Sequence, residues 1–332
     1  MLISLLQTAT DARESLFDPR HETALRLFHG FSEGFPSLAV DVYAKTLVIH
    51  DYAEAGDAET AALVSDYFRG RLPWLQAVVL KQRTGQTPET RNGILLAGTQ
   101  PDRKIRENGV WYAVDLCLNR DAGFYLDTRN LRAWEMEHLR GKTVLNTFAY
   151  TGSLGIAALA GGATRVVQLD LNRKFLNVAK TSCTLNGFPI DRKDFLSGDF
   201  WPLTSRLNRD GTRFDCVLLD PPFFASTSKG MIDAENNYAR LINKVRPLIN
   251  DGGLLVAVNN ALYVSGAAFI ATLESLCADG YLAIETLIPV PPDCTGFAAR
   301  PGKSPVPDPA PFNHATKIAV LRVRRKQDDQ AL

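Results

Sequence analysis

Two neighbouring segments place glycine, small polar residues and an acid at spacings that suit a bound nucleoside. Residues 143–146 predict a buried strand, the turn at 150–153 contains a glycine, and a helix is predicted from Ser153. A helix that starts after a tight glycine turn lets the backbone approach a ligand closely. The next predicted strand, residues 164–170, ends in Asp170, an acid placed to accept hydrogen bonds from ribose hydroxyls. The Gly-x-Gly-x-x-Gly spacing of a dinucleotide site is absent, and a purely structural turn is the alternative.

A second chemical signal follows the predicted strand 214–219, which ends in the sequence Asp-Pro-Pro-Phe. In a doubly wound sheet the carboxyl ends of the strands carry the site. Two successive prolines fix the turn, and the next aromatic ring offers a flat face to an extruded base. We therefore interpret Asp220, Pro221, Pro222 and Phe223 as the catalytic residues that hold the acceptor. A rigid strand exit with a buried phenylalanine is the structural alternative.

The order of these motifs resembles that of the class I S-adenosylmethionine-dependent methyltransferases. More narrowly, it resembles the bacterial 23S ribosomal RNA methyltransferases, which include a guanine-N7 branch and a cytosine-C5 branch. The resemblance covers about residues 22–325. Its matching segments are residues 26–30, 38–43, 123–127, 145–153, 167–170, 185–187, 198–200 and 219–224.

The resemblance implies an α/β fold, with a Rossmann-like class I methyltransferase sheet of seven strands and a smaller N-terminal α/β domain. Alternating strands and helices after residue 143 also favour a parallel sheet with right-handed crossovers. We expect an arm at residues 1–21, a small RNA-binding domain at 22–118 and the methyltransferase domain at 119–332. The cytosine branch has a further RNA-binding domain before this point, for which the sequence leaves no room.

The resemblance also implies the cofactor, S-adenosylmethionine, and the residues that bind it. Backbone around residues 148–152 is expected to hold the methionine moiety, and Asp199 the adenine amino group. Tyr125 and Asp127 stand in a segment that closes over the cofactor in the family, although capping and packing are equally good roles. The expected cofactor-binding set is Tyr125, Asp127, Asn146, Phe148, Tyr150, Thr151, Gly152, Asp170, Leu171, Asp199, Phe200 and Asp220.

The atom that accepts the methyl group is less determined. A sulfonium donor needs in-line placement of the acceptor more than acid–base help. Cytosine C5 also requires a cysteine thiolate, which the cytosine branch places after the fifth strand. Residues 258–262 contain no cysteine, so Cys294 would have to act as a displaced thiol. Because Asn259, Asn260 and residues 226–229 resemble the guanine-N7 branch, we predict guanine N7 or another nitrogen, exocyclic amines included, with cytosine C5 as the alternative.

RNA, expected to be ribosomal, is the predicted partner. The net charge is only +1, so RNA binding must depend on local basic patches that contact phosphates. A solvated basic loop is the alternative for the cations of the small domain. At the acceptor turn, the base is expected to stack on Phe223 or on Phe224. The expected RNA-binding set is Lys81, Arg83, Arg91, Arg103, Arg106, Phe224 and Asn259.

The elements that position these residues can be predicted in outline. Asp57 is expected to cap a helix over residues 58–69, and Gly252 with Gly253 to end a helix that runs from Glu235 to residue 248. A proline-rich loop at 289–311 carries Arg300 and Lys303 and is expected to be disordered or to close on RNA. The predicted strands of the small domain are residues 25–28, 38–42, 46–50, 77–80, 93–96 and 110–116. Further strands are predicted near Phe195 and at residues 254–258, 281–289 and 317–323.

Composition limits the classes of protein to which this sequence can belong. Apolar residues make up 45% of the 332 residues, as in ordinary globular domains. No apolar run reaches membrane-span length and no signal peptide is evident, so a cytoplasmic location is predicted. The five cysteines form no C-x-x-C pair and the five histidines are dispersed, so we expect no metal site. A non-catalytic ribosome assembly factor that keeps the cofactor pocket, and an enzyme for small molecules or proteins, stay as alternatives; the oligomeric state is not indicated.

Overall fold

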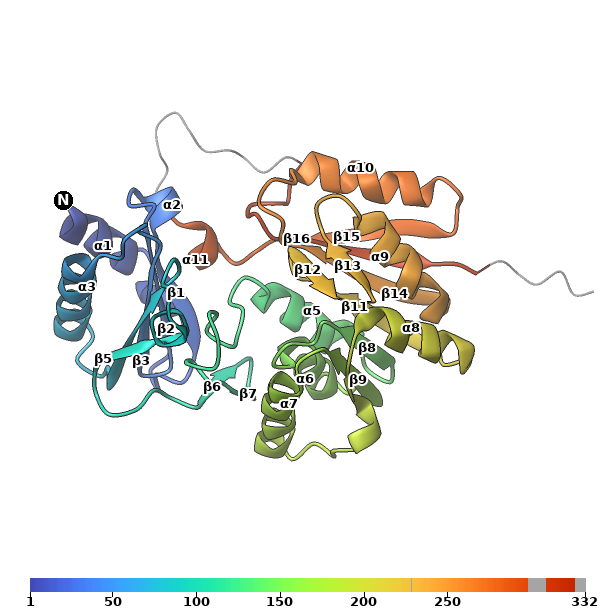
Figure 1. Cartoon of the computed structure of the whole chain (residues 1–332), viewed down its shortest axis with the longest axis horizontal. Coiled ribbons are helices and arrows are strands. Elements are labelled where there is room, and N and C mark those ends of the chain that lie inside the picture. Colours follow the sequence, from blue (N-terminus) through green and yellow to red (C-terminus); the bar gives the residue numbers. More distant parts are fainter. Residues whose placement is uncertain (228, 298–308, 326–332) are drawn as a thin grey trace, which may run out of the picture. The chain divides into compact units, whose positions relative to one another are not determined.

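Buried aliphatic runs form the two main sheets of the protein, one in each of two units (Figure 1). The computed structural model describes residues 1–227, 229–297 and 309–325. The first unit comprises Met1–Thr128 and Pro291–Pro305, and the second comprises Arg129–Val290 and Val306–Leu332. The chain thus leaves the first unit after Thr128, returns to it at Pro291 and enters the second unit again at Val306. The domain boundaries expected from the sequence stay a prediction.

The first unit contains a five-stranded sheet in the order β1-β2-β3-β4-β5. Its strands are β1 (Ala24–His29), β2 (Leu38–Tyr43), β3 (Thr46–Asp51), β4 (Ala77–Gln82) and β5 (Ile94–Ala97). The parallel step from β3 to β4 is made through α3 (Ala58–Arg71). Figure 1 shows α1 (Leu2–Asp11) beside α3 on one side of this sheet. The remaining elements are α2 (Gly30–Glu33), α4 (Pro88–Asn92) and a hairpin of β6 (Lys104–Glu107) and β7 (Val110–Ala113).

Local signals explain the helices of this unit. Asp57 caps α3 as predicted, because its side chain accepts a hydrogen bond of 2.9 Å from Thr60 N. Ala61, Val64 and Phe68 recur at helical spacing and are buried against the sheet. The arm at residues 1–21 is better ordered than its weak pattern suggested. Its α1 packs on the same core through Leu6, which is fully buried.

The returning segment of the first unit forms the short helix α11 (Pro292–Thr295), which the sequence did not predict. Asp293 holds it, because its carboxylate accepts from Arg26 N and its carbonyl accepts from Arg13. The Arg13 guanidinium is fully buried and pairs with both oxygens of Glu33, at 2.8 and 3.1 Å. Arg300 and Lys303 of the predicted loop lie outside the described residues.

The second unit contains a seven-stranded sheet in the order β10-β9-β8-β11-β14-β16-β15, as the fold prediction required. The first five strands run parallel, and β16 lies antiparallel between β14 and β15. These strands are β8 (Thr143–Thr147), β9 (Arg165–Asp170), β10 (Phe195–Ser197), β11 (Phe214–Leu219), β14 (Ile249–Asn259), β15 (Leu282–Ile288) and β16 (Lys317–Val323).

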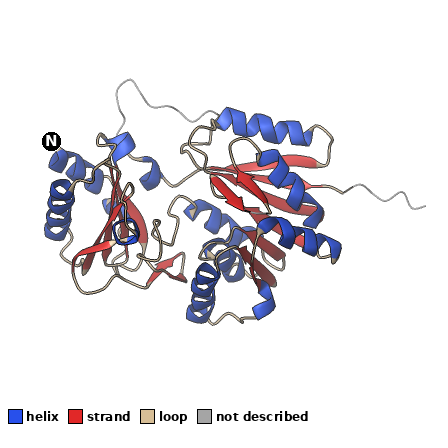
Figure 2. Ribbon diagram, in the orientation of Figure 1, coloured by secondary structure: helices blue, strands red, loops and turns tan. Residues whose placement is uncertain are grey.

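Helices cover both faces of this sheet (Figure 2). Alternate residues of β11 enter two core clusters, Val217 and Leu219 on one face, Cys216 and Leu218 on the other. Among the described residues, no helix combines the length and apolar character needed to cross a membrane. The helices are α5 (Arg129–His138), α6 (Ser153–Ala160), α7 (Arg173–Asn186), α8 (Phe200–Arg209), α9 (Tyr238–Val245) and α10 (Gly266–Cys277).

Two departures from the sequence prediction occur around β11 and β14. Residues after the Asp-Pro-Pro-Phe turn form a hairpin of β12 (Phe224–Thr227) and β13 (Gly230–Asp233), so α9 starts only at Tyr238. Gly252 and Gly253 do not end a helix; they lie inside β14. A Cβ atom at Gly253 would stand 2.9 Å from Asp215 O, so a glycine is needed where the strand pairing shifts register.

We expect Gly155→Ala to lower the free energy of unfolding. A Cβ at this position in α6 would lie 2.2 Å from Nε2 of Gln168, a side chain that is 1% exposed. Overpacking of this kind costs ~1–3 kcal/mol. Gly70→Ala in α3 is the matched control, because a Cβ there meets nothing within 4 Å and the change should stabilise by ~0.4–1 kcal/mol. Urea midpoints measure both; a Gly155→Ala protein as stable as the parent would show that Gln168 moves freely.

Candidate active site

The carboxyl ends of the five parallel strands lie at one edge of the second unit's sheet, where α/β sheets bind their ligands. We call this the ligand edge. Many of the residues singled out from the sequence stand there. Phe148 follows β8, Asp170 ends β9, Asp199 follows β10, Asp220 follows β11 and Asn259 ends β14.

The turn after β8 is held in an uncommon backbone conformation. Phe148 and Tyr150 have φ values of 54° and 51°, and Gly152 has 80°. Such values in non-glycine residues cost ~1–3 kcal/mol and persist where the surroundings impose them. Here Asp170 Oδ2 accepts from Tyr150 N at 2.8 Å, and Ala149 N donates to the end of β9. The turn thus presents the start of α6, whose first N–H groups have no intrahelical partner, at the ligand edge.

Asn146, in the strand β8 that precedes this turn, helps to position it. It is 1% exposed, and its Nδ2 donates to Gln168 Oε1 at 2.8 Å. Gln168 in turn donates to Gly152 O at 3.4 Å. Gly152 packs so closely on α7 that a Cβ atom would stand 2.5 Å from that of Ala179. Asn146 therefore holds the turn, and direct contact with a cofactor stays a proposal.

Asp170 is the acid at the carboxyl end of β9 that the sequence analysis assigned to a ribose. Its Oδ1 accepts from Asn172 N at 2.7 Å and its Oδ2 from Tyr150 N. Each carboxylate oxygen can accept a second hydrogen bond. Burial raises the pKa of Asp170 above its usual value, and the two backbone hydrogen bonds oppose that shift. The adjoining Leu171 is 63% exposed and supplies an apolar wall beside the acid.

At the end of β10, Asp199 caps α8 by accepting from Trp201 N at 2.9 Å. Phe200 is only 4% exposed and stacks on Phe148, with ring centroids 4.7 Å apart. Phe200 therefore supports Phe148, the partly exposed ring of the β8 turn. Contacts of Asp199 and Phe200 with an adenine stay proposals.

The turn after β11 exposes its aromatic rings. Phe223 is 43% and Phe224 56% exposed, which does not fit a strand exit with a buried phenylalanine. The β12–β13 hairpin fixes this turn, because Ala234 N donates to Phe223 O at 3.0 Å and Phe224 pairs with Asp233. We call Asp220, Pro221, Pro222, Phe223 and Phe224 the acceptor turn.

Asn259 does not suit the predicted RNA contact. It is 1% exposed; its Nδ2 donates to Ala234 O at 2.7 Å and its Oδ1 accepts from Ala261 N at 2.9 Å. Both ends of the amide are thus occupied by backbone. The next residue, Asn260, is partly exposed, while its Oδ1 is buried and has no hydrogen-bond partner. We propose Asn260 in place of Asn259 as the amide beside the acceptor.

Glu135 of α5 is a feature that the sequence analysis missed. It is fully buried, and neither carboxylate oxygen has a hydrogen-bond partner. Burial raises its pKa well above the usual value, the nearby Arg132 opposes this, and the charge of Asp220 adds to it. Burial at this position therefore favours the protonated, neutral form of the side chain. Its signal was an acid between Leu131 and Leu139, at the four-residue spacing of a core face.

All five cysteines lie in the described part of the chain. Of the three in the second unit, none stands at the ligand edge: Cys183 is in α7, Cys277 ends α10, and Cys216 is fully buried within β11. Burial raises the pKa of Cys183 to about 11 and that of Cys216 well above its usual value. Cys117 and Cys294 belong to the first unit, where Cys294 is fully buried.

The predicted RNA-binding cations of the first unit differ in exposure. Lys81 is fully buried, donates to Asn92 O and, at 2.9 Å, to Asn119 O, and burial lowers its pKa to about 8. A phosphate contact needs an accessible cation, so we remove Lys81 from the set. Arg91 and Arg103 are exposed.

Three other predicted residues of this unit are held by neighbours. Arg83 donates to Asp121 at 2.9 Å, and the Tyr125 hydroxyl donates to the same carboxylate at 3.1 Å. Arg106 lies over the Trp111 ring, 5.5 Å from its centroid. The roles of these residues and of Asp127 in binding RNA or cofactor stay proposals.

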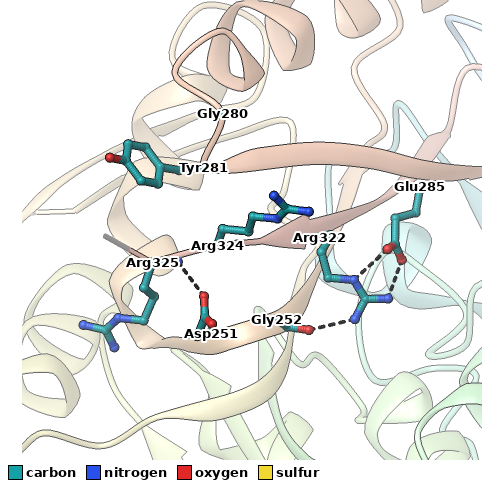
Figure 3. A pocket seen from close by; sticks show the side chains of 8 residues that line it. All are labelled: Asp251, Gly252, Gly280, Tyr281, Glu285, Arg322, Arg324 and Arg325. Carbon is teal, nitrogen blue, oxygen red and sulfur yellow. Dashed lines mark hydrogen bonds and ion pairs between the residues drawn. The ribbon is translucent and has the colours of Figure 1, made fainter. Parts of the chain in front are cut away.

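A pocket of about 690 Å³ lies at the amino end of β14, opposite the ligand edge (Figure 3). Arg322 is fixed there by both oxygens of Glu285, at 2.6 and 2.7 Å, and by Gly252 O at 2.7 Å. These groups satisfy one another, so we assign no ligand. The lining residues are Asp251, Gly252, Gly280, Tyr281, Glu285, Arg322, Arg324 and Arg325.

Comparison with known proteins identifies relatives over most of the chain. The model of the family described as S-adenosylmethionine-dependent methyltransferase matches residues 26–294. Ribosomal RNA large subunit methyltransferase I of Photobacterium profundum is 29% identical over 295 residues, which cover 85% of this chain and 72% of that protein. The protein of the same name from Vibrio cholerae is 32% identical over 289 residues, covering 84% and 71%.

Solved structures share the fold. A methyltransferase designated SMU.776, crystallised with SAH, superposes with a TM-score of 0.83 at 23% identity, covering 97% of this chain and 80% of that chain. The tRNA m1G37 methyltransferase of M. jannaschii superposes with a TM-score of 0.57 at 16% identity, covering 98% and 79%. These likenesses confirm the predicted fold class.

We propose that Asp170 accepts the ribose hydroxyls of S-adenosylmethionine, and we expect Asp170→Asn to weaken cofactor binding by ~10–150-fold, the worth of a hydrogen bond to a charged group. Because burial raises the Asp170 pKa, the parent's affinity should also fall as the pH drops toward that value. Titration calorimetry measures both. Asp194→Asn is the control, since this acid pairs with Arg165 before β10, away from the ligand edge. Parental affinity in Asp170→Asn would remove the ribose role.

Proposed function

Because the chain belongs to the family of S-adenosylmethionine-dependent methyltransferases, we propose that it methylates a base of 23S ribosomal RNA. The reaction class and the cofactor come with the family. The RNA substrate is our proposal, supported by the names of the relatives from P. profundum and V. cholerae. The observation that carries it is the exposed Phe223 after two prolines at the ligand edge, a platform of the kind that a flipped-out base needs. A ribosomal substrate places the enzyme in the cytoplasm.

The ligand edge divides into a donor side and an acceptor side. On the donor side, Asp170 binds the ribose and the turn at residues 148–152 surrounds the methionine moiety. On the acceptor side, the base stacks on Phe223 or Phe224, with Asn260 along its edge. S-adenosylmethionine supplies an activated methyl group, so the protein contributes mainly in-line placement of donor and acceptor. Asp220 stands between the two sides, next to the methionine ammonium or the acceptor.

The relatives support cytosine C5 as the acceptor better than the guanine N7 that the sequence motifs favoured. Carbon 5 of cytosine is a weak nucleophile until a thiolate adds to C6. If the chain methylates cytosine, the thiol must therefore come from a cysteine other than the one expected after the fifth strand. In the described structure none of the second unit's three cysteines stands at the ligand edge.

A specific observation favours a ring nitrogen as the second candidate. Asn260 directly follows β14 and is partly exposed, and an amide can orient a base without bonding to it covalently. A nitrogen with its own lone pair needs no thiolate. Burial raises the pKa of Cys216, which suppresses the thiolate that C5 chemistry needs.

The first unit is proposed to grip the RNA backbone. Arg83, Arg91, Arg103 and Arg106 remain in this set after the removal of Lys81. Each phosphate contact releases counterions, so neutralising these residues is expected to flatten the salt dependence of RNA binding.

Product analysis separates the two acceptors. The enzyme is incubated with S-adenosylmethionine and 23S RNA from a strain that lacks it, and the nucleosides are identified by mass spectrometry after complete digestion. We expect one methylated base. 5-Methylcytidine would establish the cytosine reading, and 7-methylguanosine or an N-methylated base the nitrogen reading. If the product is 5-methylcytidine, one of the single Cys→Ser variants should abolish it. If the product is methylated on nitrogen, every single Cys→Ser variant should still form it. Absence of any methylated base in the RNA would overturn the proposed function.

We expect Phe223→Ala to slow methyl transfer by about one to two powers of ten, because stacking on a base is worth ~1–3 kcal/mol. Affinity for S-adenosylmethionine should stay at the parental value. Leu63→Ala serves as the control, since Leu63 is 42% exposed on α3 of the first unit, close to the 43% of Phe223. Single-turnover rates measure the effect. Parental rates in both Phe223→Ala and Phe224→Ala would leave the acceptor turn without a stacking role.

A further inference from the structure

Two large apolar side chains project from the connection between β14 and α10. Leu262 is 74% exposed and Tyr263 is 81% exposed, whereas Ala261 before them is fully buried and Val264 after them packs on the core. Single exposed apolar residues are common. These two are adjacent, and they follow the end of β14, the strand that pairs with β11 before Phe223 and Phe224; adjacent exposed apolar residues at such a place indicate a binding role. We call Leu262 and Tyr263 the apolar tip.

A buried lysine holds this tip in place. Lys317, the first residue of β16, is 2% exposed and lies opposite Asn259. Its ammonium donates to Ala261 O at 2.9 Å, to Val264 O at 2.8 Å and to Ala315 O. The carbonyls on both sides of the tip are therefore bound to one charge, whose burial lowers the lysine pKa to about 8. A buried charge is costly unless its hydrogen bonds are made, so the backbone of the tip is firmly fixed.

The tip is also connected to the acceptor turn. Ala234 N donates to Phe223 O, Asn259 Nδ2 donates to Ala234 O, and the tip starts three residues after Asn259. The Tyr238 hydroxyl lies 2.7 Å from Val258 O and 3.5 Å from Leu219 O, at the ends of the same two strands. Register places Leu219 beside Ala257. Phe223 and the tip therefore follow the ends of two adjacent strands, with β14 running two residues beyond the pairing of Leu219.

We infer that the apolar tip stacks on an RNA base that neighbours the acceptor nucleotide, with Tyr263 as the stacking ring and Leu262 as its apolar support. The inference rests on the proposed function and deepens it, because it assigns a contact to the nucleotide beside the acceptor. An acceptor base that reaches Phe223 leaves its chain neighbours over the adjoining strand end. A tyrosine ring suits an unpaired base of any sequence, and a fixed backbone lowers the entropy cost of binding.

The test measures kcat and KM for RNA in Tyr263→Ala, Tyr263→Phe and the parent, with the substrate identified by product analysis. Loss of one stacked base predicts a kcat/KM for RNA that is ~5–150-fold lower in Tyr263→Ala. The effect should fall mainly on KM, and affinity for S-adenosylmethionine should not change. Tyr263→Phe keeps the ring and should restore the parental value. The slope of RNA affinity against salt should also stay parental, because no phosphate contact is removed.

Two comparisons sharpen this test. Leu262→Ala is matched by Ile190→Ala, which trims an apolar residue 42% exposed in the loop before β10 and should leave RNA turnover unchanged. In RNAs that carry an abasic residue next to the acceptor nucleotide, on its 5′ or its 3′ side, one abasic position should bring the parent and Tyr263→Ala to equal rates. That equality would identify the stacked nucleotide.

The possible failures can be told apart. Parental kcat/KM in Tyr263→Ala, or equal losses in Tyr263→Ala and Tyr263→Phe, would overturn the stacking contact while methylation by the parent upholds the proposed function. A loss in Tyr263→Ala that persists with both abasic RNAs would indicate a protein or phosphate contact instead and would also overturn the inference. A parent that methylates no ribosomal RNA would overturn the proposed function and this inference together.

Discussion

The buried hydrogen bond between Asn146 and Gln168 is the constraint on which the donor side depends. It joins the carboxyl halves of β8 and β9 at 2.8 Å, and Gln168 extends it to Gly152 O. The same glutamine fills the space at which residue 155 has no room for a Cβ atom. With these parts fixed, the turn after β8 can keep two non-glycine residues at positive φ, and Asp170 reaches its N–H groups. The pocket is thus shaped by residues that need not touch the cofactor.

The acceptor side is likewise shaped by buried hydrogen bonds, although other side chains make them. The hydroxyl of Tyr238, the amide of Asn259 and the ammonium of Lys317 each bind backbone carbonyls where β11 and β14 end. Removing one partner from such a buried set would leave a polar group without compensation, at a cost of ~1–3 kcal/mol. That penalty keeps the connecting loops in one conformation, although loops at a strand end are ordinarily mobile. Fixed loops on both sides let two substrates meet at a defined distance.

Sequence predicted the elements whose own residues specify them. Strands such as β9 and β11 are short apolar runs that end in an acid, and Asp57 predicted the start of α3 through its capping geometry. The hairpin of β12 and β13 was missed because it is stabilised by neighbours, among them the Trp201 indole that leaves no room for a Cβ at Gly230.

Site residues show the same limit. Lys81 suggested RNA binding by its type, yet its carbonyl partners Asn92 and Asn119 place it inside the first unit. Asn259 lies at the ligand edge, as the sequence analysis expected, but its amide binds backbone groups and is not exposed to RNA. Residue type gives the chemistry that is available, and partners distant in the sequence decide whether it faces solvent.

The acceptor atom is a question of the same kind: identities of 29–32% establish the family, but the atom is decided by whether a thiolate reaches the base. Burial raises the pKa of Cys216 within β11, and the nearby Glu135 and Asp215 add to that shift, which opposes formation of a thiolate there. The relatives favour cytosine C5, and that chemistry depends on a thiolate that none of the second unit's three cysteines brings to the ligand edge.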